Sequence, residues 1–320
     1  MEEPIAPRID TLDESRYRDL IQKNMGLQGK ILTVDLHIDT PWKFTKYGPF
    51  YLAEGAPYSK VSLPKMKDGR LDRAIFVVYL PDYVQDALGP RLTGLRVEGQ
   101  LSWIGKGVPF ALEGARLLGT VSRGSWRSSS LLSKPGLKYI TLTHNKANVF
   151  ADSSKDRPYH GGLSKLGAEL IVEAENKGIL IDLSHASDQT CECVLKVASR
   201  PVIASHSGCR AIVDHVRNLP DYLIEGIADT GGLIGVPFAR SFVGPGKSNV
   251  IDHIEHLIKV VGVEHVAIGS DLDGAAIVDG VEDVSDWGSL VIDGLKERGF
   301  EHKYIIAIAG GNAARLLHLQ

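Results

Sequence analysis

The stretch GILIDLSHASDQT at residues 178–190 opens with an apolar run that leads to a histidine, His185. The segment PVIASHS at residues 201–207 has the same pattern and leads to His206. Short runs rich in β-branched residues, bounded by glycine, proline or polar residues, predict β-strands. Both runs are continuously apolar rather than alternating, which is typical of strands buried on both faces of a parallel sheet.

Six further runs of this kind predict strands elsewhere in the chain. They are residues 30–39, 74–80, 108–114, 139–144, 232–238 and 265–271. Segments with helical spacing of apolar residues lie between them, at 163–178, 251–262 and 286–299. Eight β-α units favour a closed (β/α)8 TIM barrel over an open doubly wound sheet, and no G-x-G-x-x-G motif follows the first run. The fold class predicted is therefore α/β.

We expect one domain over residues 1–320, because the sequence contains no internal repeat, low-complexity tract or linker. The segment TLDESRYRDLIQKNMG at residues 11–26 has the pattern of an amphipathic helix. The prediction is a single barrel that is preceded by a helical extension over residues 1–29 or so.

The composition argues against several classes of partner. The net charge is −3 and the basic residues are dispersed, so no basic stripe for nucleic acid is expected. No apolar run approaches the roughly 18 residues that cross a bilayer. The amino terminus, MEEPIAPRID, lacks the basic and apolar regions of a secretory signal. These observations predict a cytoplasmic protein without a membrane anchor.

Residue types that bind metals or transfer protons follow six of the eight predicted strands. They are His37, Asp39, Glu113, His144, His185, His206 and Asp271. The carboxyl ends of barrel strands face one mouth, so these side chains should converge there. Residues two apart in a strand share a face, so His37 and Asp39 could bind one cation together. Histidine with carboxylate suits zinc, although manganese, iron or cobalt would accept the same donors. The set exceeds the ligands of one zinc ion, which predicts a second ion and a bridging carboxylate.

We expect the remaining polar residues and the cysteines to have structural roles or to lie at the surface. Asp35 is expected to support a neighbouring ligand, and Asp182 to orient a neighbouring loop. The histidines away from the predicted strand ends are expected at the surface. They are His160, His215, His253, His256, His265, His302 and His318. The three cysteines, Cys191, Cys193 and Cys209, are expected to be packing residues, since their odd number and spacing suit neither a disulfide framework nor a zinc ribbon.

An ordered series of motifs resembles the membrane (renal-type) dipeptidase family of the amidohydrolase superfamily. The series covers most of the chain and comprises DLHIDTPW at 35–42, LPKMKDGRLDRAIFVVYLP at 63–81, LEG at 112–114, LTHNKANVFADS at 142–153, GLSKLGAELIVEAENKGILIDLSHAS at 162–187, PVIASHSGCRAIVDHVRNLPD at 201–221 and IGSDLDG at 268–274. The resemblance implies two zinc ions per chain. His37, Asp39 and Glu113 would hold one ion, while Glu113, His185 and His206 would hold the other, with Glu113 as the bridge.

The resemblance also implies roles for three residues beside the metals. Asp271 falls on the family's proton-handling aspartate, and His144 falls on a histidine that polarises the substrate. Arg217 falls on the arginine that receives the substrate carboxylate. A guanidinium pairs bidentately with a carboxylate, which would confine the enzyme to small substrates with a free carboxyl terminus.

The implied function is hydrolysis of the amide bond of dipeptides with a free carboxyl-terminal carboxylate, with tolerance for a D-configured second residue. The family also suggests a homodimer. Two alternatives stay open, namely a related amidohydrolase that acts on another small amide, lactam or ester, and a binding protein that retained the fold without activity.

The sequence departs from the family in two places. The family commonly has Glu-Gly-Gly after the third strand, whereas this chain has Ala115 after Gly114, which adds a methyl group near the expected bridge. Renal-type members are secreted and lipid-anchored, whereas this sequence has neither a signal nor a hydrophobic tail before Gln320, which leads us to expect a soluble microbial-type relative.

Overall fold

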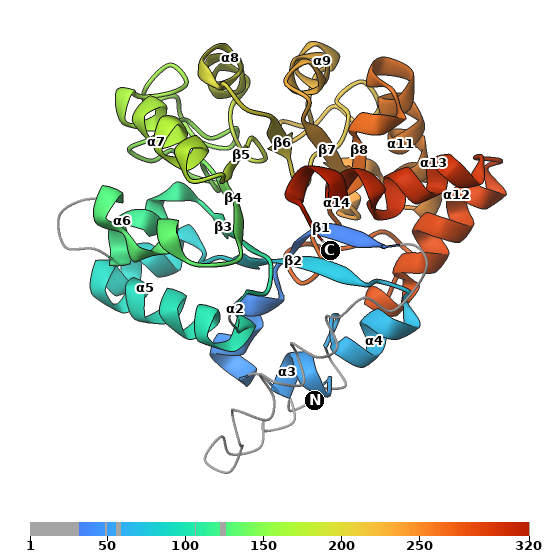
Figure 1. The fold of residues 1–320 in the computed structure, drawn as a ribbon, viewed down its shortest axis with the longest axis horizontal. Helices are drawn as coiled ribbons and strands as arrows, with labels where there is room; N and C mark the ends of the chain where they lie inside the picture. Colours follow the sequence, from blue (N-terminus) through green and yellow to red (C-terminus); the bar gives the residue numbers. More distant parts are fainter. Residues whose placement is uncertain (1–31, 49, 56–58, 106, 122–125, 320) are drawn as a thin grey trace.

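The eight predicted strands form a closed barrel in chain order, and β1 pairs with both β2 and β8 (Figure 1). The computed structural model describes residues 32–48, 50–55, 59–105, 107–121 and 126–319. The strands are β1 (Val34–Ile38), β2 (Arg73–Val78), β3 (Phe110–Glu113), β4 (Leu137–Thr141), β5 (Leu180–Asp182), β6 (Val202–Ala204), β7 (Leu233–Val236) and β8 (Val266–Ile268). All neighbouring strands are parallel. The predicted (β/α)8 barrel is confirmed, whereas the helical extension expected over residues 1–29 lies outside the described residues.

Helices surround the strands as a ring (Figure 1). They are α2 (Thr40–Tyr47), α3 (Phe50–Ala53), α4 (Leu63–Asp68), α5 (Asp82–Ile104), α6 (Leu118–Val121), α7 (Lys165–Asn176), α8 (Asp188–Val197), α9 (Asp221–Asp229), α10 (Arg240–Val243), α11 (Lys247–Val261), α12 (Gly294–Glu297), α13 (His302–Ile306) and α14 (Asn312–Leu317). The helices predicted at 163–178 and 251–262 correspond to α7 and α11. The third, at 286–299, forms as a π-helical turn over Ser289–Asp293 that leads into α12. Within the described residues, no helix is both long and apolar enough to cross a bilayer.

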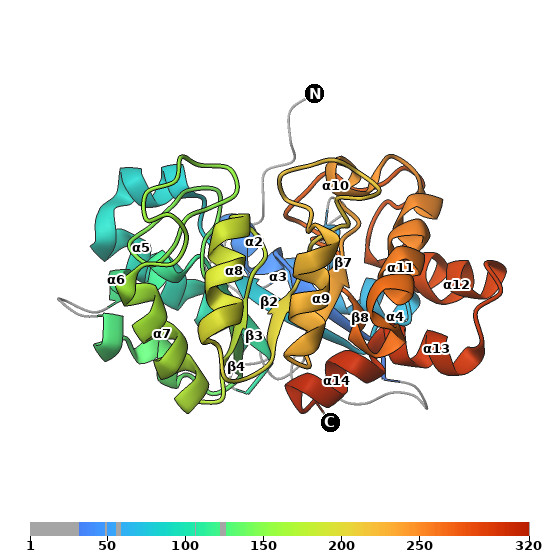
Figure 2. The ribbon, with the colours of Figure 1, turned by 90° about the horizontal axis from the view of Figure 1, so that it is seen from above.

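Two apolar layers hold the barrel together. Alternate strand residues face opposite sides of a sheet, so Ile75 and Val77 of β2 belong to the interior, while Phe76 and Val78 pack in the outer layer under the helices. Helix α14 contacts the interior layer, and Figure 2 shows it at one end of the barrel with α10 at the other. The apolar interior and α14 therefore fill one end, which leaves the carboxyl ends of the strands to form the functional mouth.

Several strands end earlier than the apolar runs that predict them. β5 ends at Asp182 and β6 ends at Ala204, so His185 and His206 lie in the loops that follow. The backbone of His185 has a φ of 68°, in the left-handed region, which is incompatible with an extended strand. The two histidines therefore reach the mouth from turns and not from the strands themselves.

Candidate metal centre

The polar residues predicted at the strand ends converge at the mouth of the barrel. Three groups have ligand atoms that all lie within 4.8 Å of one another, namely His37 with Glu113 and His206, Glu113 with His144 and His185, and His37 with Asp39 and Asp271. His144 is half-buried, and the other six residues are buried. Glu113 and His37 each belong to two groups, so the seven side chains form one continuous cluster.

Glu113 lies at the centre of the cluster. Its Oε1 is 3.0 Å from Nε2 of His185, 3.6 Å from Nε2 of His206 and 3.7 Å from Nε2 of His37. Glu113 is the last residue of β3, and its strand register with Thr141 of β4 directs it into the mouth. One carboxylate oxygen therefore faces three imidazole nitrogens, one from β1 and two from the loops that follow β5 and β6.

A buried hydrogen-bond chain determines which nitrogen of His206 carries the proton. The Ser205 hydroxyl lies 2.7 Å from Oδ2 of Asp182, which can only accept, and 2.9 Å from Nδ1 of His206. Because the hydroxyl donates its one proton to Asp182, it accepts the Nδ1–H of His206. The lone pair of His206 is therefore on Nε2, which points into the cluster.

A second chain acts in the same way on His37. The Tyr139 hydroxyl donates to the carbonyl of Leu36 at 2.7 Å and lies 3.0 Å from Nδ1 of His37. It therefore accepts the Nδ1–H of His37, and the free lone pair again lies on Nε2, toward Glu113. Outer partners of this kind orient histidines that bind metals.

Asp39 joins the cluster from outside the regular strand. The strand ends at Ile38, and Asp39 is the residue before α2, with φ −87° and ψ 11°. The pairing of β1 with β2 also shifts register between Asp35 and Ile38. Asp39 thus lies just beyond the strand, but the two side chains come together as the spacing predicts, with Nε2 of His37 and Oδ1 of Asp39 3.7 Å apart.

The donor atoms fit a divalent cation. Nε2 of His37, Oδ1 of Asp39 and Oε1 of Glu113 are buried and have no hydrogen-bond partner among the described residues. Burial lowers the pKa of His37 and raises the pKa values of Asp39 and Glu113, since charged groups lose hydration there. Neutral imidazoles and carboxylates are the donors that zinc prefers, and a cation would offset the cost of burying the carboxylates together.

Asp271 approaches Asp39 closely in a strained turn. Its backbone φ of 61° is left-handed, which is uncommon for a residue with a side chain. Burial raises the pKa of Asp271 to about 7, and a hydrogen bond with Asp39 opposes that shift. A Cβ on Gly274 would overlap carboxylate oxygens of both aspartates, so the turn requires glycine at this position.

His144 lies at the edge of the cluster and has two polar neighbours. Its Nδ1 is 3.0 Å from Oδ2 of Asp82, at the start of α5, and its Nε2 is 3.0 Å from Nδ2 of Asn145. Burial lowers the pKa of His144, and Asp82 opposes this by favouring the charged ring. The carboxylate holds a proton on Nδ1, and Nε2 accepts an N–H of Asn145, so the ring is neutral; a second proton on Nε2 would replace that bond and create a cation that Asp82 stabilises.

Arg217 is buried beside the cluster. Its Nη2 donates to the carbonyl of His206 at 3.4 Å, and its Cζ lies 5.2 Å from the ring centroid of Phe242. Nε of Arg217 is buried without a hydrogen-bond partner among the described residues. Burial lowers the pKa of Arg217, while the negative charges of Asp271 and Glu113 oppose that shift.

The two supporting aspartates bond to backbone near the cluster. Asp35 accepts hydrogen bonds from the backbone N–H of His37, the backbone N–H of Ser270 and Nε1 of Trp287. Asp182 accepts the backbone N–H groups of Ser184 and Ser205. These contacts orient the segments that carry His37 and His206, in agreement with the expectations for both residues.

Sequence reasoning missed several residues and misplaced one. Tyr139, Ser205 and Asp82 were not identified, because a tyrosine in a strand, a serine and a helix-initiating aspartate each have ordinary structural uses. The expectation of a surface position is wrong for His253, which is fully buried and accepts the backbone N–H of Cys209 at 2.8 Å. Cys191 and Cys209 are buried, as expected of packing residues. The methyl group of Ala115 is buried in the outer apolar layer.

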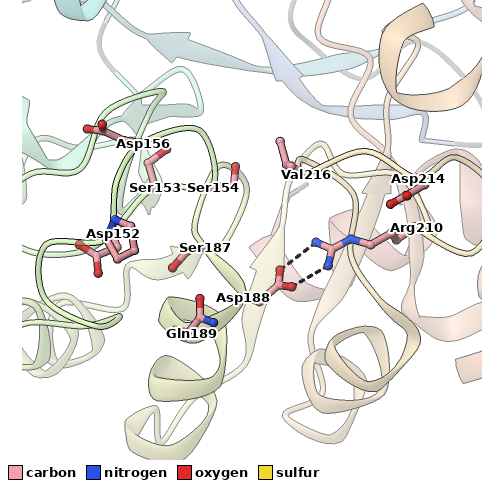
Figure 3. Close-up of a pocket in the computed structure, with 11 residues that line it drawn as sticks. Asp152, Ser153, Ser154, Asp156, Ser187, Asp188, Gln189, Arg210, Asp214 and Val216 are labelled. Atoms are coloured by element: carbon pink, nitrogen blue, oxygen red, sulfur yellow. Dashed lines mark hydrogen bonds and ion pairs between the residues drawn. The ribbon is translucent and has the colours of Figure 1, made fainter.

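A polar pocket lies beside the cluster and contains none of its residues. Figure 3 shows Asp188 and Arg210 side by side among the lining residues, joined by two hydrogen bonds of 2.6 and 2.8 Å. The pocket also includes Ser153, whose hydroxyl donates to the carbonyl of His144 at 2.6 Å. It therefore adjoins the rim of the mouth and does not replace the cluster as the candidate site.

Comparisons with known proteins agree with this geometry. Residues 107–319 match the family model described as membrane dipeptidase (peptidase family M19). Dipeptidase aclJ of Aspergillus oryzae is 30% identical over 299 residues, which cover 81% of this chain and 70% of the relative. Dipeptidase verJ of Clonostachys rogersoniana is 38% identical over 191 residues, 58% of this chain and 49% of the relative. The chain thus spans about half the length of the curated relatives that it matches first.

Solved structures share the fold. A metallo peptidase from Rhodobacter sphaeroides, liganded with a phosphinate mimic of the dipeptide L-Ala-D-Ala, superposes with a TM-score of 0.78 at 22% identity, over 91% of this chain and 99% of that one. The probable dipeptidase PvdM from Pseudomonas aeruginosa superposes with a TM-score of 0.77 at 22% identity, over 95% and 98%.

Proposed function

Because the chain belongs to the membrane dipeptidase family, we propose that it hydrolyses the amide bond of dipeptides at a metal centre in the barrel mouth. The observation that carries the proposal is the position of Glu113, whose buried Oε1 lies within 3.7 Å of three imidazole nitrogens. Such a set of donors is costly to bury without a cation.

We assign one zinc ion to His37, Asp39 and Glu113, and a second to Glu113, His185 and His206. The lone pairs on Nε2 of His37 and His206, together with the unpaired carboxylate oxygens, support this division. When bound, the ions supply Lewis-acid activation of the substrate carbonyl and of water. Manganese, iron or cobalt would be accepted by the same donors.

Asp271 is proposed to handle the proton. A pKa raised to about 7 suits a group that accepts a proton from water and returns it to the leaving amine near neutral pH. Its hydrogen bond with Asp39 keeps the carboxyl group beside the proposed ligands.

His144 and Arg217 are proposed to bind the two ends of the reacting dipeptide. A proton on Nε2 of His144 would donate to the oxygen of the scissile carbonyl as negative charge develops there, and Asp82 would stabilise the charged ring. The buried guanidinium of Arg217 would receive the free carboxylate. The structural neighbour that holds a mimic of L-Ala-D-Ala supports tolerance for a D-configured second residue.

The test combines metal analysis with a panel of substrates. We expect two zinc ions per chain and turnover of L,L- and L,D-dipeptides, both lost in Glu113→Gln. N-acyl amino acids and lactones serve as competing substrates. Bound metal with turnover of those compounds alone would contradict the dipeptidase assignment, and a folded chain without metal or turnover would contradict an enzymatic role.

A further inference from the structure

A second basic side chain accompanies Arg217 at the mouth. Nζ of Lys155 lies 5.8 Å from the ring centroid of Phe242, and Cζ of Arg217 lies 5.2 Å from the same centroid. The ring of His215 is 5.0 Å from that ring as well. Phe242 is thus surrounded by three nitrogen-bearing side chains from two different loops.

The segment that carries Lys155 is held against the candidate metal centre. The hydroxyl of Ser153 donates to the carbonyl of His144 at 2.6 Å, and it accepts the backbone N–H of Lys155 at 3.3 Å. The backbone N–H of Ser154 donates to the carbonyl of His185 at 2.9 Å. Lys155 therefore extends from a turn whose position is determined by two residues of the cluster.

The loop that carries Arg217 is hydrogen-bonded to the segment that carries Phe242. Asn218 donates to the carbonyl of Phe242 at 2.8 Å, and the backbone N–H of Arg217 donates to Nδ1 of His215 at 3.1 Å. Because Nδ1 of His215 accepts this bond, the ring is neutral and carries its one proton on Nε2. Lys155 and Arg217 are accordingly the positive charges that contact Phe242 within the described part of the chain.

Among the residues that the structure describes, neither of these two charges forms an ion pair within 4.0 Å, because the lysine and arginine ion pairs there are formed by other side chains. Besides burial, the charge of Arg217 lowers the pKa of Lys155, and both charges lower the pKa of His215, while Asp271 attracts both. Arg217 is buried and Lys155 is exposed beside it, so an anion with two negative charges could offset both charges at once.

We propose that Lys155 and Arg217 form a two-cation subsite that selects dipeptides with aspartate or glutamate as the second residue. Arg217 binds the terminal carboxylate, and Lys155 binds the side-chain carboxylate of the same residue. This inference rests on the proposed function, because it assigns the carboxyl-terminal residue of the substrate to the Arg217 side of the mouth. Lys155 is a specificity-determining residue and takes no part in bond cleavage.

The experiment compares isosteric substrates that differ only in charge. We expect the purified, zinc-loaded enzyme to cleave Ala-Asp with a kcat/KM about two- to fivefold above that for Ala-Asn, since an ion pair with the exposed Lys155 contributes a modest factor. Lys155→Met should abolish this preference while leaving Ala-Asn and Ala-Ala unchanged. Lys155→Arg should restore most of it, and added salt should reduce it in the wild type.

Lys146→Met is the matched control, because Lys146 lies in the same loop and pairs with Asp86 at the surface. It should keep the preference for Ala-Asp. Equal rates for Ala-Asp and Ala-Asn in the wild type would overturn the inference and leave the proposed dipeptidase activity standing. An equal loss for all three substrates in Lys155→Met would also overturn it, since Lys155 would then bind the terminal carboxylate. Failure of the wild type to cleave any dipeptide would instead reject the proposed function.

Discussion

The hydroxyl of Ser205 joins the carboxylate of Asp182 to the imidazole of His206, with distances of 2.7 Å to Oδ2 and 2.9 Å to Nδ1. Asp182 is buried and ends β5, so this arrangement links one strand to the histidine that follows the next. The contact determines both the orientation of the ring and the nitrogen that faces Glu113. Metal affinity should therefore depend on a residue that contacts no metal.

Ser205→Ala should weaken zinc binding about 10- to 100-fold, because His206 loses the acceptor for its Nδ1 proton. Titration against a chelator of known affinity measures the change. Ser207→Ala is the control, since Ser207 is equally buried at the same strand end and its hydroxyl bonds to Ser184. Equal affinities for the two variants would contradict the role of Ser205.

Asp82→Asn should lower kcat about tenfold and change KM little, because a neutral amide no longer stabilises a charged His144 as the carbonyl oxygen gains charge. Steady-state kinetics with one dipeptide separates the two constants. Asp86→Asn, one helical turn further along α5, removes only the surface pairs with Arg116 and Lys146 and should be neutral. A rise in KM without a change in kcat would show that Asp82 only shapes the pocket.

Arg217→Met should reduce kcat/KM for dipeptides with a free carboxylate about 100-fold, since a buried charge pair is lost. Carboxyl-amidated analogues should be hydrolysed as slowly by the variant as by the wild type. Arg210→Met is the comparison, because Arg210 lies in the same loop but pairs with Asp188 in the neighbouring pocket (Figure 3). An equal loss for free and amidated substrates would exclude Arg217 as the carboxylate anchor.

Gly274→Ala should abolish activity and metal binding, because the added Cβ overlaps the carboxylates of Asp39 and Asp271. Gly99→Ala in α5, where an added Cβ meets no atom within 4 Å, should be harmless. Metal content and thermal unfolding of the two variants give the comparison. Full metal content in Gly274→Ala would show that the turn can move without cost.

His253 makes the stability of the fold depend on pH. Burial lowers its pKa from 6.5 to about 4, so the unfolded chain binds a proton between these values and the folded chain does not. Stability should fall as the pH decreases from about 6.5 to 4, by about 3 kcal/mol from this group. His253→Asn can keep an acceptor for the Cys209 N–H without titrating, so its denaturant midpoint should vary less over this range. Parallel curves for both proteins would contradict the assignment.

The strands could be predicted from the sequence because burial on both faces of a barrel strand requires a continuous apolar run. The eight runs predicted the barrel, and the convergence of strand ends at one mouth predicted which polar residues would meet there. The exact ends of the strands were harder to predict, since β5 and β8 end three residues before His185 and Asp271, whose left-handed backbone residue type alone does not indicate.

The sequence by itself determined the (β/α)8 architecture and the positions of the metal-binding residue types, because both follow from local periodicity and strand order. Only the tertiary structure decided the partners of those residues. Tyr139 meets His37 across 102 residues, and Asp82 meets His144 across 62. Such side-chain contacts depend on which strands and loops become neighbours, and they leave no periodic signal in the chain. For the same reason, the approach of Lys155 and Arg217 to one aromatic ring became visible only in the folded molecule.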